Sequence, residues 1–233
     1  MKRARIADLD VVLTGGADRE GGGSGPLVVL LHGFGAPGED LVPLHRVMRV
    51  PRETRFAFPA APLELDMMPG ARAWWHIDMI RLQEAMERGD MRDLSSEEPE
   101  GLYAAREKMD AFLTQIRKDL APSKLVLGGF SQGSMLSMDL ALRTSHPIDA
   151  LVILSGTLLA QDVWVPKMKA LAGKPIFQSH GKHDPLLPYA LAERLKTELV
   201  AAGANVKFVP FRGQHEIPPP VLDELVRFLE PLL

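Results

Sequence analysis

The chain has 233 residues, of which 46% are hydrophobic and 24% charged, and it carries a formal net charge of −3 with a pI near 6.2. This is the composition of an ordinary globular protein, and it excludes a disordered or fibrous class. The weakly acidic balance offers no basic surface, so nucleic acid is not expected as a partner. Cysteine is absent, which excludes a disulfide framework, a thiolate nucleophile and a thiolate metal site.

Targeting and membrane signals are not evident in the sequence. The basic start of the chain is interrupted by Asp8 and Asp10 before the apolar core of a signal peptide could form. Unbroken apolar runs outside Pro-rich loops reach about five residues, far short of the roughly 20 that span a bilayer. We therefore expect a soluble, cytoplasmic protein without integral membrane association, folded as one domain over residues 1–233.

Short apolar runs alternate with longer amphipathic runs along most of the chain. The Gly-rich segment 17–26 predicts a flexible loop, such as a hairpin between two early strands. The apolar runs predict strands over 27–31, 124–127, 150–154, 175–178 and 206–210. Amphipathic periodicity predicts helices over 39–48, 102–120, 135–142, 191–199 and 221–232. Together they predict an α/β fold with a mostly parallel central sheet and helices on both faces.

The pattern becomes irregular between residues 59 and 99, where one helix is expected over 80–88. A long irregular insertion in a compact domain is commonly a functional loop. Segment 76–99 is therefore expected to form a cap or lid over a cleft, with its methionines offering a deformable apolar surface. Surface elaboration packed by the same methionines is an equally good interpretation.

The sequence GFSQG from Gly129 to Gly133 matches the motif G-x-S-x-G. A predicted strand leads into it and a predicted helix follows, which is the setting in which this motif carries a nucleophilic serine. Side chains at the two glycine positions would collide where the backbone turns sharply. The alternative is an ordinary Gly-rich turn in which Ser131 only caps the helix.

A nucleophilic serine needs a base and a carboxylate that orients the base. After Ser131, two loops that follow predicted strands supply Asp184 and then His215, in the order Ser, Asp, His that this motif requires. Both loops lie at the carboxyl ends of parallel strands, where α/β proteins bind ligands. We predict that Ser131 is the nucleophile, His215 the base and Asp184 its orienting acid.

Several other residues could compete for these roles. Glu216 could orient its neighbour His215, although sequence neighbours rarely have the required geometry. His180 and His183 flank Asp184 and could join His215 in a metal site, but hydrolytic zinc sites usually show recognisable ligand spacing. We therefore expect no metal site. The remaining histidines are expected on a surface helix, on a loop and at a helix end: His45, His76 and His146.

Ester hydrolysis also creates an oxyanion that needs two donors, usually backbone N–H groups. One is expected from Gln132, the residue after the nucleophile. The other is expected from the loop His32–Gly35 after an early strand, where we assign the N–H of Phe34. Taken alone, that loop would be interpreted as a glycine turn between a strand and a helix.

These residues lie in longer segments that resemble the phospholipase/carboxylesterase family, which includes the acyl-protein thioesterases. The matching segments follow the family's order: LHGFGAPGEDL at 31–41, ARAWWHID at 71–78, GGFSQGSM at 128–135, SHGKHDPLLPY at 179–189 and GQHEIP at 213–218. The resemblance implies an α/β-hydrolase fold without cofactor and the same catalytic and oxyanion residues. The family often has Leu or Arg at the position of Phe34, so a narrower acyl side of the cleft is expected here. Segment 76–99 looks longer than is usual in the family.

The predicted function is that of a serine hydrolase that cleaves small to medium carboxylic esters or thioesters through an acyl-enzyme intermediate. A lysophospholipase or protein deacylase with a long-chain site is an alternative, as is a catalytically silent binding module. The resemblance suggests that Trp74 and Trp75 line the acyl pocket, but at least one is expected to be structural. The partner is expected to be a small or lipid-like acyl ester. A homodimer is compatible with the sequence, although no residue demonstrates one.

Overall fold

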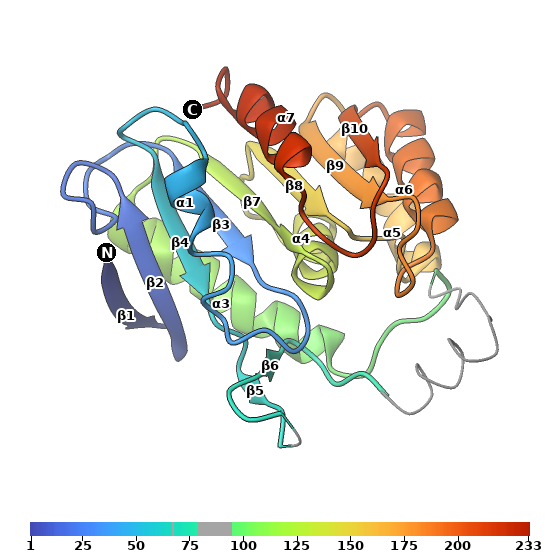
Figure 1. The fold of residues 1–233 in the computed structure, drawn as a ribbon, viewed down its shortest axis with the longest axis horizontal. Coiled ribbons are helices and arrows are strands. Elements are labelled where there is room, and N and C mark those ends of the chain that lie inside the picture. The colour runs from blue at the N-terminus through green and yellow to red at the C-terminus, as the bar shows by residue number, and fades with distance from the viewer. Residues whose placement is uncertain (67, 79–94) are drawn as a thin grey trace.

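A central eight-stranded sheet runs through the computed structural model, which describes residues 1–66, 68–78 and 95–233 (Figure 1). Its strands are hydrogen-bonded in the order β1-β2-β4-β3-β7-β8-β9-β10. Their bounds are Lys2–Ile6 (β1), Leu9–Gly15 (β2), Leu27–Leu31 (β3), Arg55–Pro59 (β4), Leu125–Phe130 (β7), Ala150–Leu154 (β8), Pro175–Gly181 (β9) and Asn205–Phe211 (β10). Every pairing from β4 to β10 is parallel, whereas β2 runs antiparallel to β1 and β4. A small separate ribbon joins β5 (Leu63–Glu64) to β6 (Arg72–Ala73).

Helices cover both faces of the sheet (Figure 1). One face packs against α3 (Leu102–Leu120), α4 (Gln132–Arg143), α5 (Gln161–Lys167), the 3₁₀ turn η1 (Met168–Leu171) and α6 (Tyr189–Ala201). The other packs against α1 (Leu44–Val47) and α7 (Pro219–Leu229). Because β3 and β8 lie between these two layers, all their residues are buried.

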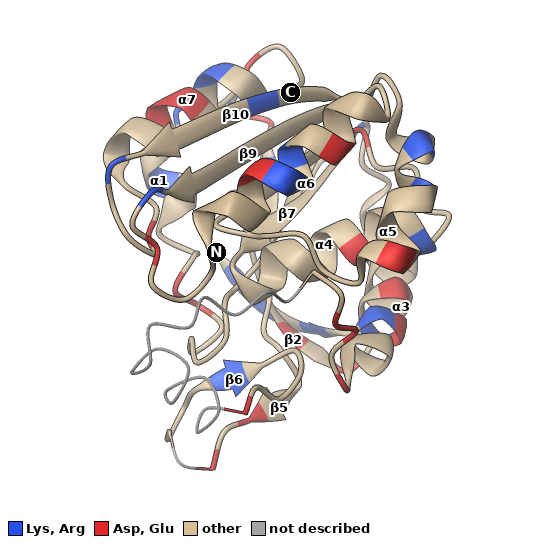
Figure 2. Ribbon diagram, turned by 90° about the vertical axis from the view of Figure 1, so that its right-hand side faces the viewer, with Lys and Arg blue, Asp and Glu red and all other residues tan. Residues whose placement is uncertain are grey.

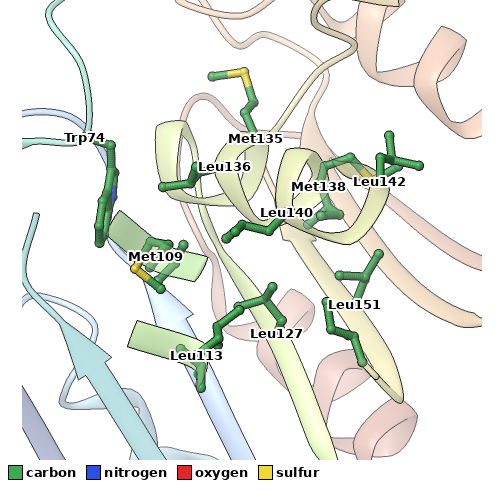
Figure 3. Packing of buried hydrophobic residues seen from close by; sticks show 14 of the residues in the cluster. Trp74, Met109, Leu113, Leu127, Met135, Leu136, Met138, Leu140, Leu142 and Leu151 are labelled. Atoms are coloured by element: carbon green, nitrogen blue, oxygen red, sulfur yellow. The ribbon is translucent and has the colours of Figure 1, made fainter. Parts of the chain in front are cut away.

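The core on the α3 side contains both tryptophans singled out in the sequence, Trp74 and Trp75. Figure 3 shows Trp74 on the same side of the sheet as Met109 and Leu113 of α3, and all three are buried. Met135 of α4 belongs to the same buried cluster, and Figure 3 shows its side chain pointing away from Leu127 and Leu151 of the sheet. Figure 2 shows charged residues on α3, α5 and α6, whereas β9 carries none. Among the described residues, no helix is both long and apolar enough to cross a bilayer.

The predicted α/β architecture is confirmed, and the predicted bounds of β3, β8 and α3 coincide with the observed ones. The helix expected over 39–48 is wrong, because only Leu44–Val47 is helical. Pro43 has no N–H to continue a helical ladder, and the residues before it form turns such as that from Val42 N–H to the Glu39 carbonyl (3.1 Å). The helix expected over 80–88 lies outside the described residues.

The Gly-rich segment 17–26 is a loop, but it does not form a hairpin between neighbouring strands. It joins β2 to β3, and β4 lies between those two strands in the sheet. The hairpin near the N-terminus instead joins β1 to β2 through Ala7 and Asp8, both at positive φ.

A buried arginine holds the Gly-rich loop in place. Arg55, the first residue of β4, is fully buried and donates to the carbonyl oxygens of Gly23 (2.7 Å), Gly25 (2.6 Å from Nη2) and Leu120 (2.9 Å). These contacts join the loop to β4 and to the end of α3. Backbone carbonyls outside regular structure need such partners when they are shielded from water.

We expect Arg55→Met to lower the free energy of unfolding by ~2–4 kcal/mol, because it leaves three carbonyl oxygens without the donor that a fully buried side chain supplies. Urea unfolding followed by circular dichroism measures this change. Arg52→Met, at an exposed position of the turn before β4, is the matched control and should change stability by less than ~0.5 kcal/mol. Equal stability of the two variants would contradict the structural role of Arg55.

Candidate active site

Ser131 occupies a sharp turn between β7, which ends at Phe130, and α4, which begins at Gln132. Its backbone has φ 54° and ψ −121°, a conformation that costs a non-glycine residue ~1–3 kcal/mol. The Ser131 N–H donates to the Leu154 carbonyl of β8 at 2.8 Å. Its carbonyl accepts from the Ser134 hydroxyl at 2.7 Å and from two N–H groups of α4. The strained turn is therefore held on both sides.

Glycines allow this turn to approach the end of β3. A β-carbon at Gly129 or Gly133 would overlap the carbonyl oxygen of Leu31. One at Gly33, in the loop after β3, would lie 3.3 Å from the β-carbon of Ser131. The expectation that side chains would collide here is confirmed, and it explains why the motif needs glycine on both sides of the serine.

Asp184 and His215 are brought together from two separate loops. Nδ1 of His215 lies 2.6 Å from Oδ2 of Asp184, while Oδ1 accepts from the N–H groups of Leu186 and Leu187, each at 2.9 Å. Burial would raise the pKa of Asp184, but the hydrogen bonds from His215 and these amides outweigh it and hold the pKa below its ordinary value. Asp184 is thus an anion that fixes the His215 ring. The competing Glu216 accepts instead from Gln214 N–H at 3.1 Å.

A second histidine contacts the same carboxylate. Nε2 of the fully buried His180 lies 2.9 Å from the Leu187 carbonyl and 3.3 Å from Oδ2 of Asp184. Burial lowers the pKa of His180, which favours a neutral ring that donates from Nε2. His183 is exposed. Over the ranges 1–66, 68–78 and 95–233, no three or more His, Asp or Glu side chains are placed to hold a metal ion.

The other four histidines, His32, His45, His76 and His146, lie in segments other than the loops of Asp184 and His215. His45 lies in α1, its Nδ1 2.6 Å from the Val42 carbonyl, and His76 is an exposed loop residue. His146 was expected to end a helix, but α4 ends at Arg143, and Nε2 of His146 lies 2.9 Å from Oδ1 of Asp110 in α3.

His32 is buried at the end of β3. Its Nε2 must accept the Ala61 N–H (2.9 Å), so its proton lies on Nδ1, which donates to the Gly33 carbonyl (2.8 Å). Burial lowers the pKa of His32, which keeps the ring neutral.

A cavity of about 1650 Å³ opens beside the turn. Ser131 and His215 both line it, and the two ring centroids of His215 and Phe130 are 4.8 Å apart. Phe34 and Gln132, the predicted oxyanion donors, line the same cavity. Its remaining walls are mainly apolar and include Pro62, Leu63, Met68, Ile77, Pro99, Met135, Leu159, Leu186 and Leu187.

Both tryptophans line this cavity, and both are almost fully buried, Trp74 at 1% exposed and Trp75 at 3%. The Trp74 indole N–H donates to the His32 carbonyl at 3.0 Å. Trp74 therefore serves as an anchor as well as a wall. Parts of the segment expected to form a cap also line the cavity, at 76–78 and 97–99. Residues 79–94 of that segment lie outside the described residues.

Sequence reasoning missed three polar side chains that support this region: His32, His180 and the amide of Gln132. His180 was considered only as a metal ligand. His32 and Gln132 stand inside recognised motifs, LHGFG and GFSQG, but only their neighbours and backbones were assigned a role. The signal was a polar side chain next to an apolar strand, where burial requires a partner.

Two buried neutral histidines should make the protein less stable in mild acid. The unfolded chain binds protons on these rings below the ordinary pKa of 6.5, whereas His32 and His180 resist protonation in the folded state. Stability is therefore lost as pH falls through 6.5. Each ring contributes up to about 1.4 kcal/mol between about pH 7.5 and 5.5.

Urea unfolding at both pH values tests this. In His32→Gln the pH-dependent loss should shrink by up to about 1.4 kcal/mol relative to the unsubstituted protein, whatever the absolute stability of the variant. An unchanged pH dependence would show that His32 titrates alike in both states.

This chain is similar in sequence to proteins of one known family. A model of the phospholipase/carboxylesterase family matches residues 23–233. Acyl-protein thioesterase 1 of Gibberella zeae is 28% identical over 217 residues, covering 87% of this chain and 88% of that protein. Acyl-protein thioesterase 1 of Saccharomyces cerevisiae is 27% identical over 216 residues, covering 87% and 91%.

Solved structures of esterases have a similar fold. The crystal structure of esterase PE8 superposes with a TM-score of 0.78 at 28% identity, over 95% of this chain and 99% of that one. The carboxylesterase of Bacillus cereus superposes with a TM-score of 0.70 at 20% identity, over 94% and 92%, and so supports the fold alone.

Proposed function

The chain belongs to the phospholipase/carboxylesterase family and has the α/β-hydrolase fold, and we propose that it hydrolyses carboxylic esters or thioesters through an acyl-enzyme on Ser131. The observation that carries the proposal is the 2.6 Å contact between His215 and the buried anion Asp184, with His215 sharing a cavity wall with Ser131. A base oriented in this way beside a serine on a strained turn is the arrangement that nucleophilic ester cleavage needs.

In the proposed reaction, the Ser131 hydroxyl oxygen attacks the acyl carbon while Nε2 of His215 takes its proton. The carbonyl oxygen becomes an oxyanion, and the backbone N–H groups of Phe34 and Gln132 donate to it. When the intermediate collapses, the bond to the alcohol or thiol breaks and the leaving group takes the proton from His215. Water then repeats the sequence on the acyl-serine, which releases the carboxylic acid and restores the Ser131 hydroxyl. Asp184 stabilises the protonated His215 ring in both halves.

Ser131→Ala should lower kcat for p-nitrophenyl esters by ~10⁵-fold or more, because no other described group replaces the nucleophile. Esters from acetyl to palmitoyl should be compared, together with labelling by a fluorophosphonate probe that reacts with activated serines. Ser137→Ala, which removes the hydroxyl of a buried serine within α4, is the control and should retain kcat within ~3-fold. Labelling that persists in Ser131→Ala would assign the nucleophile to another residue.

Asp184→Asn should lower kcat by ~10⁴-fold while the protein stays folded. The asparagine oxygen can still accept from Leu186 and Leu187, but its NH₂ group would face Nδ1 of His215 and disfavour the required tautomer. Glu216→Gln is the control, because a glutamine oxygen can still accept from the Gln214 N–H. If Glu216→Gln were the more damaging change, the orienting acid would be Glu216.

The size of the cavity favours long acyl chains within this function, as in a lysophospholipase or protein deacylase. Its volume of about 1650 Å³ exceeds the ~300–1,000 Å³ typical of small-molecule pockets, and its walls are mainly apolar. Each buried methylene contributes ~0.8 kcal/mol, so kcat/KM could rise up to about fourfold per carbon until the chain fills the cavity. A maximum at acetyl or butyryl in the ester series would favour the small-ester alternative. A folded protein that neither turns over nor labels would favour the binding module. A cytoplasmic location and a homodimer remain predictions from the sequence.

A further inference from the structure

The Gln132 side chain forms a polar clasp beneath the proposed oxyanion site. Gln132 follows Ser131 at the start of α4 and is only 1% exposed. Its Oε1 accepts the Trp74 N–H at 2.9 Å, and its Nε2 donates to the Trp75 carbonyl at 2.8 Å. Because only an oxygen can accept that N–H, both contacts require the same orientation of the amide. One side chain thus pairs with two backbone groups of a loop 58 positions earlier in the chain.

Trp74 carries the connection on to the other side of the site. Its indole N–H donates to the His32 carbonyl at 3.0 Å, and the two ring centroids lie 5.5 Å apart. His32 in turn donates from Nδ1 to the Gly33 carbonyl, directly before Phe34. A series of hydrogen bonds of 3.0 Å or less therefore connects Gln132, which carries one proposed oxyanion donor, to the loop of Phe34, which carries the other.

The sheet alone does not fix these two donors relative to each other. β3 and β7 are paired only as far as Leu31 opposite Gly129, and both donors lie beyond that pair. Oxyanion donors act only when they are held close to the position of the developing charge, within about 0.5 Å. A connection beyond the ends of the strands supplies this restraint. Trp74 and Trp75 also line the cavity, so the same connection fixes its wall.

We propose that Gln132 is a positioning residue. Through Trp74 and His32, its side chain fixes the position of the Phe34 N–H relative to the Gln132 N–H. The same contacts connect both donors to the wall of the acyl cavity. This role is separate from that of the Gln132 backbone N–H, which every substitution at this position retains. The inference rests on the proposed ester or thioester hydrolysis.

The test uses Gln132→Met, which has similar length but breaks both hydrogen bonds of the amide. We expect kcat for a short ester to fall by ~10–100-fold with little change in KM, because the defect lies in stabilising the oxyanion. Affinity for a trifluoromethyl ketone, which forms a serine adduct with an oxyanion, should fall by the same factor as kcat/KM. A loss that affected only packing would not produce this agreement.

Two further variants keep the test decisive. Gln178→Met removes an equally buried glutamine of β9 that donates to the Ala192 carbonyl of α6, and it should lower stability while leaving kcat/KM within ~3-fold. Trp74→Phe removes the indole link to His32 together with part of the ring that lines the cavity, and should lower kcat and ketone affinity together by ~3–10-fold even if Gln132→Met does not fold.

The outcomes separate the two proposals. An unsubstituted protein that neither turns over any ester nor labels would overturn the proposed function, and the clasp with it. An active protein in which Gln132→Met and Trp74→Phe both retain kcat and ketone affinity would overturn the clasp alone.

Discussion

A side chain at either Gly129 or Gly133 would overlap the carbonyl oxygen of Leu31, so the turn around Ser131 can reach the end of β3 only because both positions are glycine. Parallel pairing of β3 with β7 makes the two strands end at the same level. The close approach then places the loop after β3 beside the first turn of α4. N–H groups from both segments can face one point only because of this contact, and the proposed oxyanion site depends on it.

The buried carboxylate of Asp184, at the carboxyl ends of the parallel strands, is stabilised by several hydrogen-bond donors. An isolated anion would be costly in this environment, but one oxygen accepts from the amides of Leu186 and Leu187 and the other lies within 3.3 Å of both His215 and His180. These donors all belong to the protein itself. The charge that would stabilise a protonated His215 is therefore already oriented, and little reorganisation is needed during the proposed reaction.

The sequence predicted those parts of the structure that burial alone determines. The apolar run of β3 and the helical periodicity of α3 gave the observed bounds, and the order of Ser131, Asp184 and His215 identified residues of which the last two are in contact. β4 was not predicted, because its buried Arg55 is satisfied by carbonyls of distant loops. The clasp was missed for a related reason. Gln132 bonds to backbone atoms, which leave no pattern in the sequence, and the partner loop is far away in the chain.

The two halves of the proposed oxyanion site are held by different means. The Ser131 carbonyl is bonded to the Ser134 hydroxyl and to N–H groups of the first turn of α4, so the nucleophile and the Gln132 N–H move as one unit with the helix. Phe34 belongs to a loop that is bonded to the Arg72 backbone through the Gly35 N–H and the Ala36 carbonyl, each at 2.9 Å, and that the proposed clasp connects to Gln132 through Trp74 and His32. Substitutions around Ser131 and Gln132 are poorly tolerated, because they disturb the strained turn itself. The loop of Phe34 can be adjusted through Trp74, which also lines the cavity, so substrate preference can change there while the nucleophile stays in place.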